Sequence, residues 1–230
     1  MKKIVVLTGA GMSAESGIST FRDTGGLWEN HRVEDVATPE GFHKNPELVL
    51  EFYNQRRREL LKVIPNKGHV GLASLENDFK VSVVTQNVDN LHEQAGSTKV
   101  IHLHGELMKS CPVNNLSVSY DIPPEKPDIL LGDTDANGVQ LRPFIVWFGE
   151  AVPKIEEAVV EVESADILVI IGTSLNVYPA AGLLHYAKQG MPIFLIDPNE
   201  VRTHRNDIHF IQQPASKGVE ELSRLLDKHK

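Results

Sequence analysis

Short apolar runs rich in β-branched residues alternate with longer segments in which apolar residues recur at helical spacing. The runs predicted as buried strands are Ile4–Leu7, Val81–Thr85, Val100–Leu103, Ile145–Phe148, Ile167–Ile171 and Ile193–Ile196. The segments predicted as helices are Pro46–Leu61, Gly68–Asn77, Val152–Ser164, Tyr178–Gln189 and Lys217–Lys228. Continuous apolar strands separated by helices indicate a parallel sheet covered on both faces. We therefore predict an α/β fold with a doubly wound, Rossmann-like parallel sheet and a smaller inserted lobe.

Two stretches that break the alternation predict the inserted lobe. Residues 20–66 show helical and loop patterns without a strand, and residues 106–143 are rich in proline with little periodicity. We interpret both as insertions into one unit spanning residues 1–230. The larger domain would comprise about 1–20, 67–105 and 144–230, and the lobe about 21–66 and 106–143.

The glycine-rich run Gly9–Gly17 follows the first strand and is expected to open a helix. Glycines there let the backbone turn tightly beside a diphosphate, which the helix N-terminus would attract. The same pattern also serves close packing of a strand against a helix, so alone it leaves both interpretations open. An acidic residue ending a second strand about 20 positions later is missing, although Asp197 ends a much later strand. A dinucleotide would therefore not be held as in common dehydrogenases.

Composition excludes several classes of protein. A net charge of −8 over 230 residues argues against nucleic acid as a partner. The lone cysteine, Cys111, allows neither an intramolecular disulfide nor a four-thiolate metal site. The apolar runs are far shorter than the ~20 residues that span a bilayer, and no leader pattern precedes the first strand. We expect a soluble cytoplasmic protein without a membrane partner.

Polar residues follow three of the predicted strands. Gln86–Asp89 come after one strand, His104 and Gly105 after the next, and Gly172–Ser174 after a third. Because ligands bind at the carboxyl ends of parallel strands, these groups should gather at one edge with Gly9–Gly17.

Five ordered motifs carry a resemblance to a known family. They are Gly-Ala-Gly-Met-Ser-Ala-Glu-Ser-Gly-Ile-Ser-Thr-Phe-Arg-Asp, Thr-Gln-Asn-Val-Asp-Asn-Leu-His, His-Leu-His-Gly-Glu-Leu, Val-Trp-Phe-Gly-Glu and Gly-Thr-Ser-Leu. From residue 4 to about 216 the chain resembles the sirtuins, which are NAD-dependent protein deacylases. The resemblance implies that NAD is consumed and that acylated-lysine proteins or peptides are the substrates. The acyl oxygen would displace nicotinamide, and the products would be free lysine and O-acyl-ADP-ribose.

The resemblance also assigns residues to roles. It implies that His104 is the general base and that Asn87 is the second catalytic residue. The NAD-binding residues that it implies are Gly9, Ala10, Gly11, Ala14, Glu15, Thr20, Phe21, Arg22, Trp28, Gln86, Asn87, Val88, Asp89, Gly172, Thr173, Ser174, Asp197, Pro198, Asn199 and Ala215. Val146, Phe148 and Gly149 would bind the substrate backbone by strand addition.

Spacing alone leaves other interpretations of these residues open. His102 shares a strand face with His104, and only the family motif selects His104. Gln86 and Asn87 could be ordinary turn residues. Two further functions also remain: NAD hydrolysis or ADP-ribosyl transfer, and a non-catalytic module that binds NAD.

Tyr53 and Arg56 are three residues apart on one predicted helix face. They match the Tyr-x-x-Arg signature of sirtuins that prefer succinyl and malonyl groups, because a guanidinium and a phenol can bind a distal carboxylate. The alternative is a solvated basic face, since Arg56 opens the charge run Arg56–Arg58. We predict desuccinylase and demalonylase activity with some deacetylase activity.

The chain departs from most sirtuins at the zinc site. Cys111 stands near the first of four expected cysteines, but Asn114 replaces its partner and the second pair is absent. A tetrahedral zinc site needs four ligands, so we predict no metal. Asp133, Asp135 and Asn137 resemble a calcium loop, but Phe144 occupies the position of its bidentate Glu, which favours a simple turn. We expect a monomer.

Overall fold

A parallel sheet forms the centre of the larger part of the molecule. The computed structural model describes residues 1–19 and 31–229, and within them the sheet has six strands in the order β3–β2–β1–β7–β8–β9. The strands are β1 (Lys3–Thr8), β2 (Lys80–Thr85), β3 (Val100–His102), β7 (Ile167–Ile171), β8 (Ile193–Ile196) and β9 (Ile208–Ile211). Because the strand order reverses at β1, between β2 and β7, the sheet is doubly wound, as predicted.

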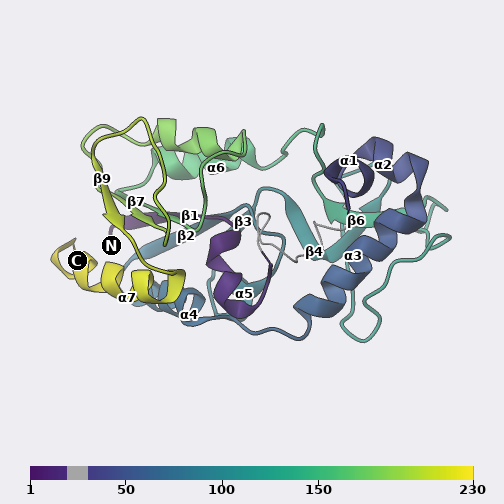
Figure 1. The fold of residues 1–230 in the computed structure, drawn as a ribbon, viewed down its shortest axis with the longest axis horizontal. Helices are drawn as coiled ribbons and strands as arrows, with labels where there is room; N and C mark the ends of the chain where they lie inside the picture. The colour runs from purple at the N-terminus through teal and green to yellow at the C-terminus, as the bar shows by residue number, and fades with distance from the viewer. Residues whose placement is uncertain (20–30, 230) are drawn as a thin grey trace.

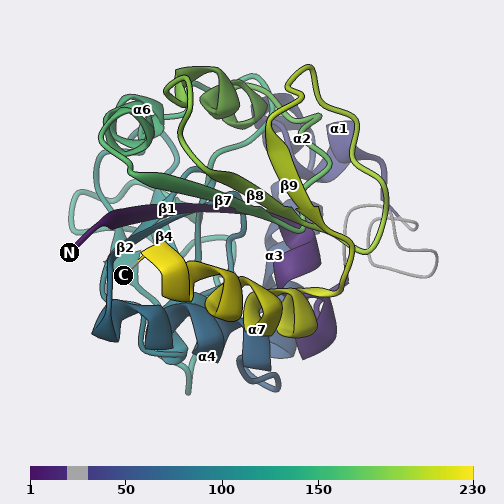
Figure 2. The same ribbon diagram turned by 90° about the vertical axis from the view of Figure 1, so that its left-hand side faces the viewer.

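Helices cover both faces of this sheet (Figure 2). Ile4 and Val6 pack with α4 (Lys67–Ser74) and α7 (Ala215–Leu226) on one face. Val5 and Leu7, which alternate with them, pack with α6 (Ile155–Glu163) and the 3₁₀ helix Ala180–Tyr186 on the other. Burial of alternate residues on opposite faces explains why the four central residues of β1, Ile4–Leu7, are all apolar.

A smaller lobe lies to one side of the sheet, at the right of Figure 1. It holds the antiparallel strands β5 (Tyr120–Asp121), β4 (Gly105–Pro112) and β6 (Leu141–Ile145), in that order. The helices α1 (Val33–Val36), α2 (Pro39–Lys44) and α3 (Pro46–Leu60) pack on them, while the short α5 (Leu91–Gln94) follows β2. No strand occurs in the described part of the first predicted insertion, residues 31–66.

Two predictions about strands are wrong. Ile145–Phe148 is not a strand of the parallel sheet, because β6 ends at Ile145 and pairs antiparallel with β4. Residues 106–143, where the proline-rich pattern with little periodicity predicted no strand, contain most of β4, β5 and most of β6. These strands escaped prediction because they mix buried and half-exposed positions and include Pro143, unlike a continuous apolar run. β9 escaped prediction because its middle residues are exposed.

Two predicted helices also differ. The glycine-rich run forms 3₁₀ turns at Ala10–Met12 and Ala14–Ser16 in place of an α-helix. The backbone N–H of Gly11 donates out of the turn to the carbonyl oxygen of Gly172, and Gly17 has a φ of +92°, which ends the segment. Tyr178–Gln189 contains a 3₁₀ helix, Ala180–Tyr186. Among the helices of residues 1–19 and 31–229, none is long and apolar enough to cross a bilayer.

Candidate active site

The loops that follow β1 and β7 touch at the point where the strand order reverses. The N–H of Gly9 donates to the carbonyl oxygen of Ile171 (3.0 Å), and that of Gly11 donates to Gly172 (2.9 Å). A Cβ on Gly11 would lie 2.7 Å from Cα of Gly172, which no side chain tolerates. Glycines are therefore required for close packing of the two loops. This packing places both loops where ligands bind in open α/β sheets.

Asn87, Ser13 and Asp89 form a buried hydrogen-bonded cluster beside these loops. The Asn87 amide nitrogen donates to the Gly9 carbonyl oxygen (3.0 Å) and to Ser13 Oγ (3.2 Å). Ser13 Oγ in turn donates to Asp89 Oδ2 (2.9 Å). Burial raises the pKa of Asp89, against the opposing bonds from Ser13 and the backbone of Leu91. Sequence reasoning missed Ser13, although it lies inside the glycine-rich run.

His69 contacts this cluster through Ser13. The backbone N–H of Asn66 donates to His69 Nδ1 (3.3 Å), so the neutral ring carries its proton on Nε2, which lies 3.5 Å from Ser13 Oγ. Burial lowers the pKa of His69 to about 4, so the ring is neutral near pH 7. His92 packs against His69 with the ring centroids 4.8 Å apart, and Thr8 Oγ1 lies 3.1 Å from its Nε2. No sequence pattern signals these contacts.

His104 presents its side chain next to Gln86. Its Nδ1 lies 3.0 Å from the Gln86 carbonyl oxygen, and a carbonyl can only accept. Nδ1 therefore carries the proton and Nε2 keeps its lone pair. Burial lowers the pKa of His104, which favours the neutral ring near pH 7. The backbone N–H of Gln86 donates to Thr8, and its side chain to Thr173 Oγ1 (3.2 Å), so the partner of His104 is itself fixed.

His102, the alternative that spacing left open, has both ring nitrogens engaged. Nδ1 lies 3.0 Å from the Asn87 carbonyl oxygen and Nε2 lies 2.7 Å from Glu93 Oε1. Burial opposes a charge on this ring, but the bonds to Glu93 and Asn87 raise the pKa of His102 above its ordinary value. An imidazolium that donates from both nitrogens suits this arrangement. His102 thus braces the loop Gln86–Asp89.

Helix α3 brings Tyr53 and Arg56 together, as their spacing predicted. The helix begins at Pro46, with Asn45 Oδ1 accepting from the N–H of Leu48 (3.1 Å). Tyr53 is buried, and its hydroxyl accepts from Trp147 Nε1 (3.1 Å). The Arg56 guanidinium lies 5.6 Å from the ring centroid of Phe52. Burial raises the pKa of Tyr53 to about 12. Burial also lowers the pKa of Arg56, and the negative charges of Glu59 and Asp89 partly offset this effect.

The predicted substrate-binding segment runs between His104 and the small lobe. The N–H of Val146 donates to the His104 carbonyl oxygen (3.0 Å), and that of Phe148 donates to Ala37 (3.0 Å). Phe148 is exposed, and Gly149 has a φ of +92°, which favours glycine. The segment therefore lies beside the histidine and is bonded through one backbone N–H to His104 and through another to Ala37 of the small lobe, while Phe148 and Gly149 lie in a turn.

Of the remaining predicted NAD-binding residues, some lie near the glycine-rich run and others lie in a separate cavity. Glu15 accepts from Ser216 N (2.8 Å) and Oγ (2.7 Å), which ties the glycine-rich run to α7 beside Ala215. Asp197 and Asn199 line a separate cavity of about 250 Å³ with Phe210. Four others lie along the loops. Ala10 and Ala14 lie in the 3₁₀ turns, the Val88 carbonyl oxygen accepts from the N–H of Leu107, and the Pro198 carbonyl oxygen accepts from the side chain of Gln212. Thr20, Phe21, Arg22 and Trp28 lie outside the described residues.

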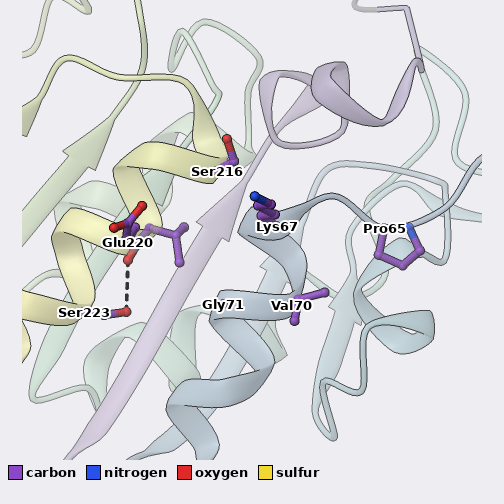
Figure 3. A pocket seen from close by; sticks show the side chains of 8 residues that line it. Pro65, Lys67, Val70, Gly71, Ser216, Glu220 and Ser223 are labelled. Atoms are coloured by element: carbon purple, nitrogen blue, oxygen red, sulfur yellow. Dashed lines mark hydrogen bonds between the residues drawn. The ribbon is translucent and has the colours of Figure 1, made fainter.

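A larger pocket lies elsewhere. Its volume is about 410 Å³. Figure 3 shows it between α4 and α7, with Val70 and Gly71 on one helix and Glu220 and Ser223 on the other. None of the described residues that line it belongs to the predicted site.

The residues near Cys111 do not fit the zinc that many sirtuins hold. Its thiol is buried and donates to the Pro143 carbonyl oxygen (3.7 Å), and burial raises its pKa, which disfavours the thiolate that zinc requires. The described residues include no group of three or more potential ligands arranged around a metal. The Asp133–Asn137 segment forms a turn, with Asp135 Oδ1 accepting from the N–H groups of Asn137 and Val139.

Comparison with known proteins agrees with this geometry. Residues 9–179 match the Sir2 family. A protein of Bacteroides thetaiotaomicron named NAD-dependent protein deacylase is 62% identical over 231 residues, covering 98% of each chain. A solved Sir2 homologue in complex with ADP-ribose superposes with a TM-score of 0.90 at 40% identity, covering 99% of this chain and 93% of the homologue. A Sir2 homologue in complex with NAD superposes with a TM-score of 0.87 at 41% identity, over 99% and 90%. The chain belongs to the Sir2 family.

Proposed function

We propose that this protein removes acyl groups from protein lysines at the expense of NAD, and that it prefers acyl groups that end in a carboxylate. In the reaction NAD supplies an activated ribose, from which the acyl oxygen displaces nicotinamide. The observation that carries the deacylase function is the fixed tautomer of His104 beside the cluster of Asn87, Ser13 and Asp89. Membership of the Sir2 family and the similarity to NAD-dependent deacylases support it.

His104 acts as the general base. Because Nδ1–H donates to Gln86, the lone pair on Nε2 can accept a proton from a ribose hydroxyl, and the lowered pKa keeps that lone pair available near pH 7. The hydroxyl then attacks the acyl carbon, which by then is joined through its oxygen to the ribose. Water adds, the bond from the acyl carbon to the lysine nitrogen breaks, and the products are free lysine and O-acyl-ADP-ribose. His102 does not compete for this role, since its nitrogens are bonded to Glu93 and Asn87.

Asn87 and Asp89 hold the nicotinamide ribose and its carboxamide. The bonds from Asn87 to Gly9 and Ser13 fix the amide, and Ser13 fixes the carboxylate of Asp89. The carboxylate accepts from the carboxamide NH₂, which orients the leaving group. The glycine loops carry the diphosphate, and the cavity of Asp197 and Asn199 takes the adenosine.

Tyr53 and Arg56 bind the distal carboxylate of the acyl group. Arg56 is half-buried on the same helix face as Tyr53, and the Tyr53 phenol stays protonated at any physiological pH. Asp89 contributes to the potential at Arg56, so the pair lies within electrostatic reach of the NAD site. A hydrogen bond to a charged group contributes about 1.5–3 kcal/mol, roughly a tenfold to hundredfold preference per contact.

One assay tests the proposal. The purified protein is incubated with NAD and with acetyl-, succinyl-, malonyl- or unmodified-lysine peptides of one sequence, and nicotinamide release is followed. The proposal requires release that depends on an acyl group and is faster with succinyl or malonyl. Release without peptide would instead indicate an NAD hydrolase, and no release a binding module. The domain boundaries, a monomeric state and a cytoplasmic location stay predictions from the sequence.

A further inference from the structure

Trp147, a buried residue of the small lobe, has polar contacts to both its ring and its backbone in addition to apolar packing. The guanidinium of Arg142 lies 3.7 Å from the centroid of its ring. Arg142 in turn donates to both carboxylate oxygens of Glu150 (2.9 and 2.8 Å) and to the Ile145 carbonyl oxygen (2.9 Å). Glu150 also accepts from the backbone N–H of Trp147 (2.7 Å). Both the backbone and the ring of this buried tryptophan are therefore fixed by one ion pair.

The fixed indole determines how the Tyr53 hydroxyl can bond. An indole N–H only donates, so in the 3.1 Å contact the phenol oxygen is the acceptor. The single proton of the phenol must then point away from Trp147. Burial keeps this phenol protonated, so it has a proton to offer. The hydroxyl is thus arranged as a donor before any ligand arrives.

We propose that Trp147 is a specificity-positioning residue that orients the Tyr53 hydroxyl as a hydrogen-bond donor for the distal carboxylate of the acyl group. The inference rests on the proposed acyl preference and adds a residue to it. A phenol without the indole N–H could rotate and turn its oxygen lone pairs toward the carboxylate, which would repel it. A phenylalanine at position 147 would keep a ring beneath Arg142 while removing the donor.

The test is a double-mutant cycle on the selectivity ratio, which is kcat/KM for a succinyl peptide divided by kcat/KM for the acetyl peptide of the same sequence. The variants are Trp147→Phe, Tyr53→Phe and the double variant. We expect each single variant to lower the ratio about three- to tenfold, mainly through KM for the succinyl peptide. The double variant should be no less selective than Tyr53→Phe alone, because Trp147 acts through the Tyr53 hydroxyl.

A second measurement tests the contact independently of acyl preference. The chain has two tryptophans, so its NMR spectrum holds two indole N–H signals, and loss of one in Trp147→Phe assigns the Trp147 signal. Tyr53→Phe should move that signal upfield, since the hydrogen bond is lost.

The outcomes separate the two claims. A ratio unchanged in Trp147→Phe but lowered in Tyr53→Phe overturns the role of Trp147 and leaves the proposed acyl preference standing. The role of Trp147 is also overturned if Trp147→Phe lowers the ratio by the same factor in the Tyr53→Phe background as in the natural chain, because the indole would then act independently of Tyr53. A ratio unchanged in Tyr53→Phe overturns the acyl preference, and the inference falls with it even if the indole signal moves.

Discussion

Nδ1 of His104 lies 3.0 Å from the carbonyl oxygen of Gln86, and this contact decides which nitrogen of the ring can serve as a base. Gln86 is fixed to β1 through Thr8 and to the loop after β7 through Thr173, so the tautomer of His104 depends on the two loops that meet at the centre of the sheet.

The pH dependence of turnover should report the pKa of His104. Burial lowers that pKa below the ordinary 6.5, and the mechanism needs the neutral ring. Activity should therefore persist as pH falls to 6.5 and be lost only at lower pH. The dependence of kcat on pH with an acetyl peptide measures this loss of activity. An acid limb centred above pH 6.5 would be inconsistent with a buried base.

Replacement of Arg56 should change which acyl group is preferred. Arg56→Met removes the cation that would pair with a carboxylate, so the ratio of succinyl to acetyl kcat/KM should fall roughly tenfold or more. Arg58→Met is the matched control, because Arg58 lies on the same helix but pairs with Glu51 and Asp128 at the surface. Equal losses with both peptides in Arg56→Met would remove Arg56 from the acyl pocket.

Arg57 should be the structural anchor of the small lobe. It is fully buried, and its guanidinium donates to the carbonyl oxygens of Pro127 and Leu107 and to the side chain of Asn54. Arg57→Met would remove all three donations, although Asn54 Oδ1 would still accept from the N–H of Ile129. We expect the free energy of unfolding to fall by about 2–4 kcal/mol. Urea denaturation measures the loss. Arg58→Met should cost under about 1 kcal/mol, since its ion pairs are exposed.

The His102–Glu93 pair should make stability depend on pH with a defined sign. The folded state raises the pKa of His102, so its contribution is fully present below the unfolded pKa of about 6.5 and is lost as pH rises through the folded value. The variant His102→Gln should be less stable than the natural chain at pH 6. The difference between their free energies of unfolding should become smaller as the pH rises from 6 to 9. Unfolding curves across that range provide the comparison. A deficit that grows with pH would show that the ring is neutral in the folded state.

The sequence predicts those strands whose burial on both faces requires an unbroken run of apolar residues. Ile167–Ile171 and Ile193–Ile196 match β7 and β8 at both ends because both faces of these strands are covered. β4 was missed because Glu106, Lys109 and Ser110 interrupt its apolar positions, and one face of a lobe strand remains accessible. Local pattern carries little information about such strands.

The site divides in the same way. His104 and Asn87 are recognisable from ordered motifs, whereas the supporting contacts of Ser13 and His102 join residues far apart in the chain. The role of Arg57 could not be predicted, because Arg57 lies in the run Arg56–Arg58, which resembles a solvent-exposed basic face. Nothing in the order of three arginines says that the middle one meets the carbonyl oxygens of Leu107 and Pro127.

The most direct test of the mechanism is to compare two rates in His104→Ala: steady-state deacylation, and exchange of labelled nicotinamide into NAD in the presence of an acyl peptide. Because the base acts after nicotinamide has left, deacylation should fall at least about a hundredfold while exchange continues. A melting temperature close to that of the natural chain would confirm that the variant is folded. Deacylation retained within a few fold, or lost in proportion to exchange, would contradict the assignment of His104 as the base of the acyl-transfer step.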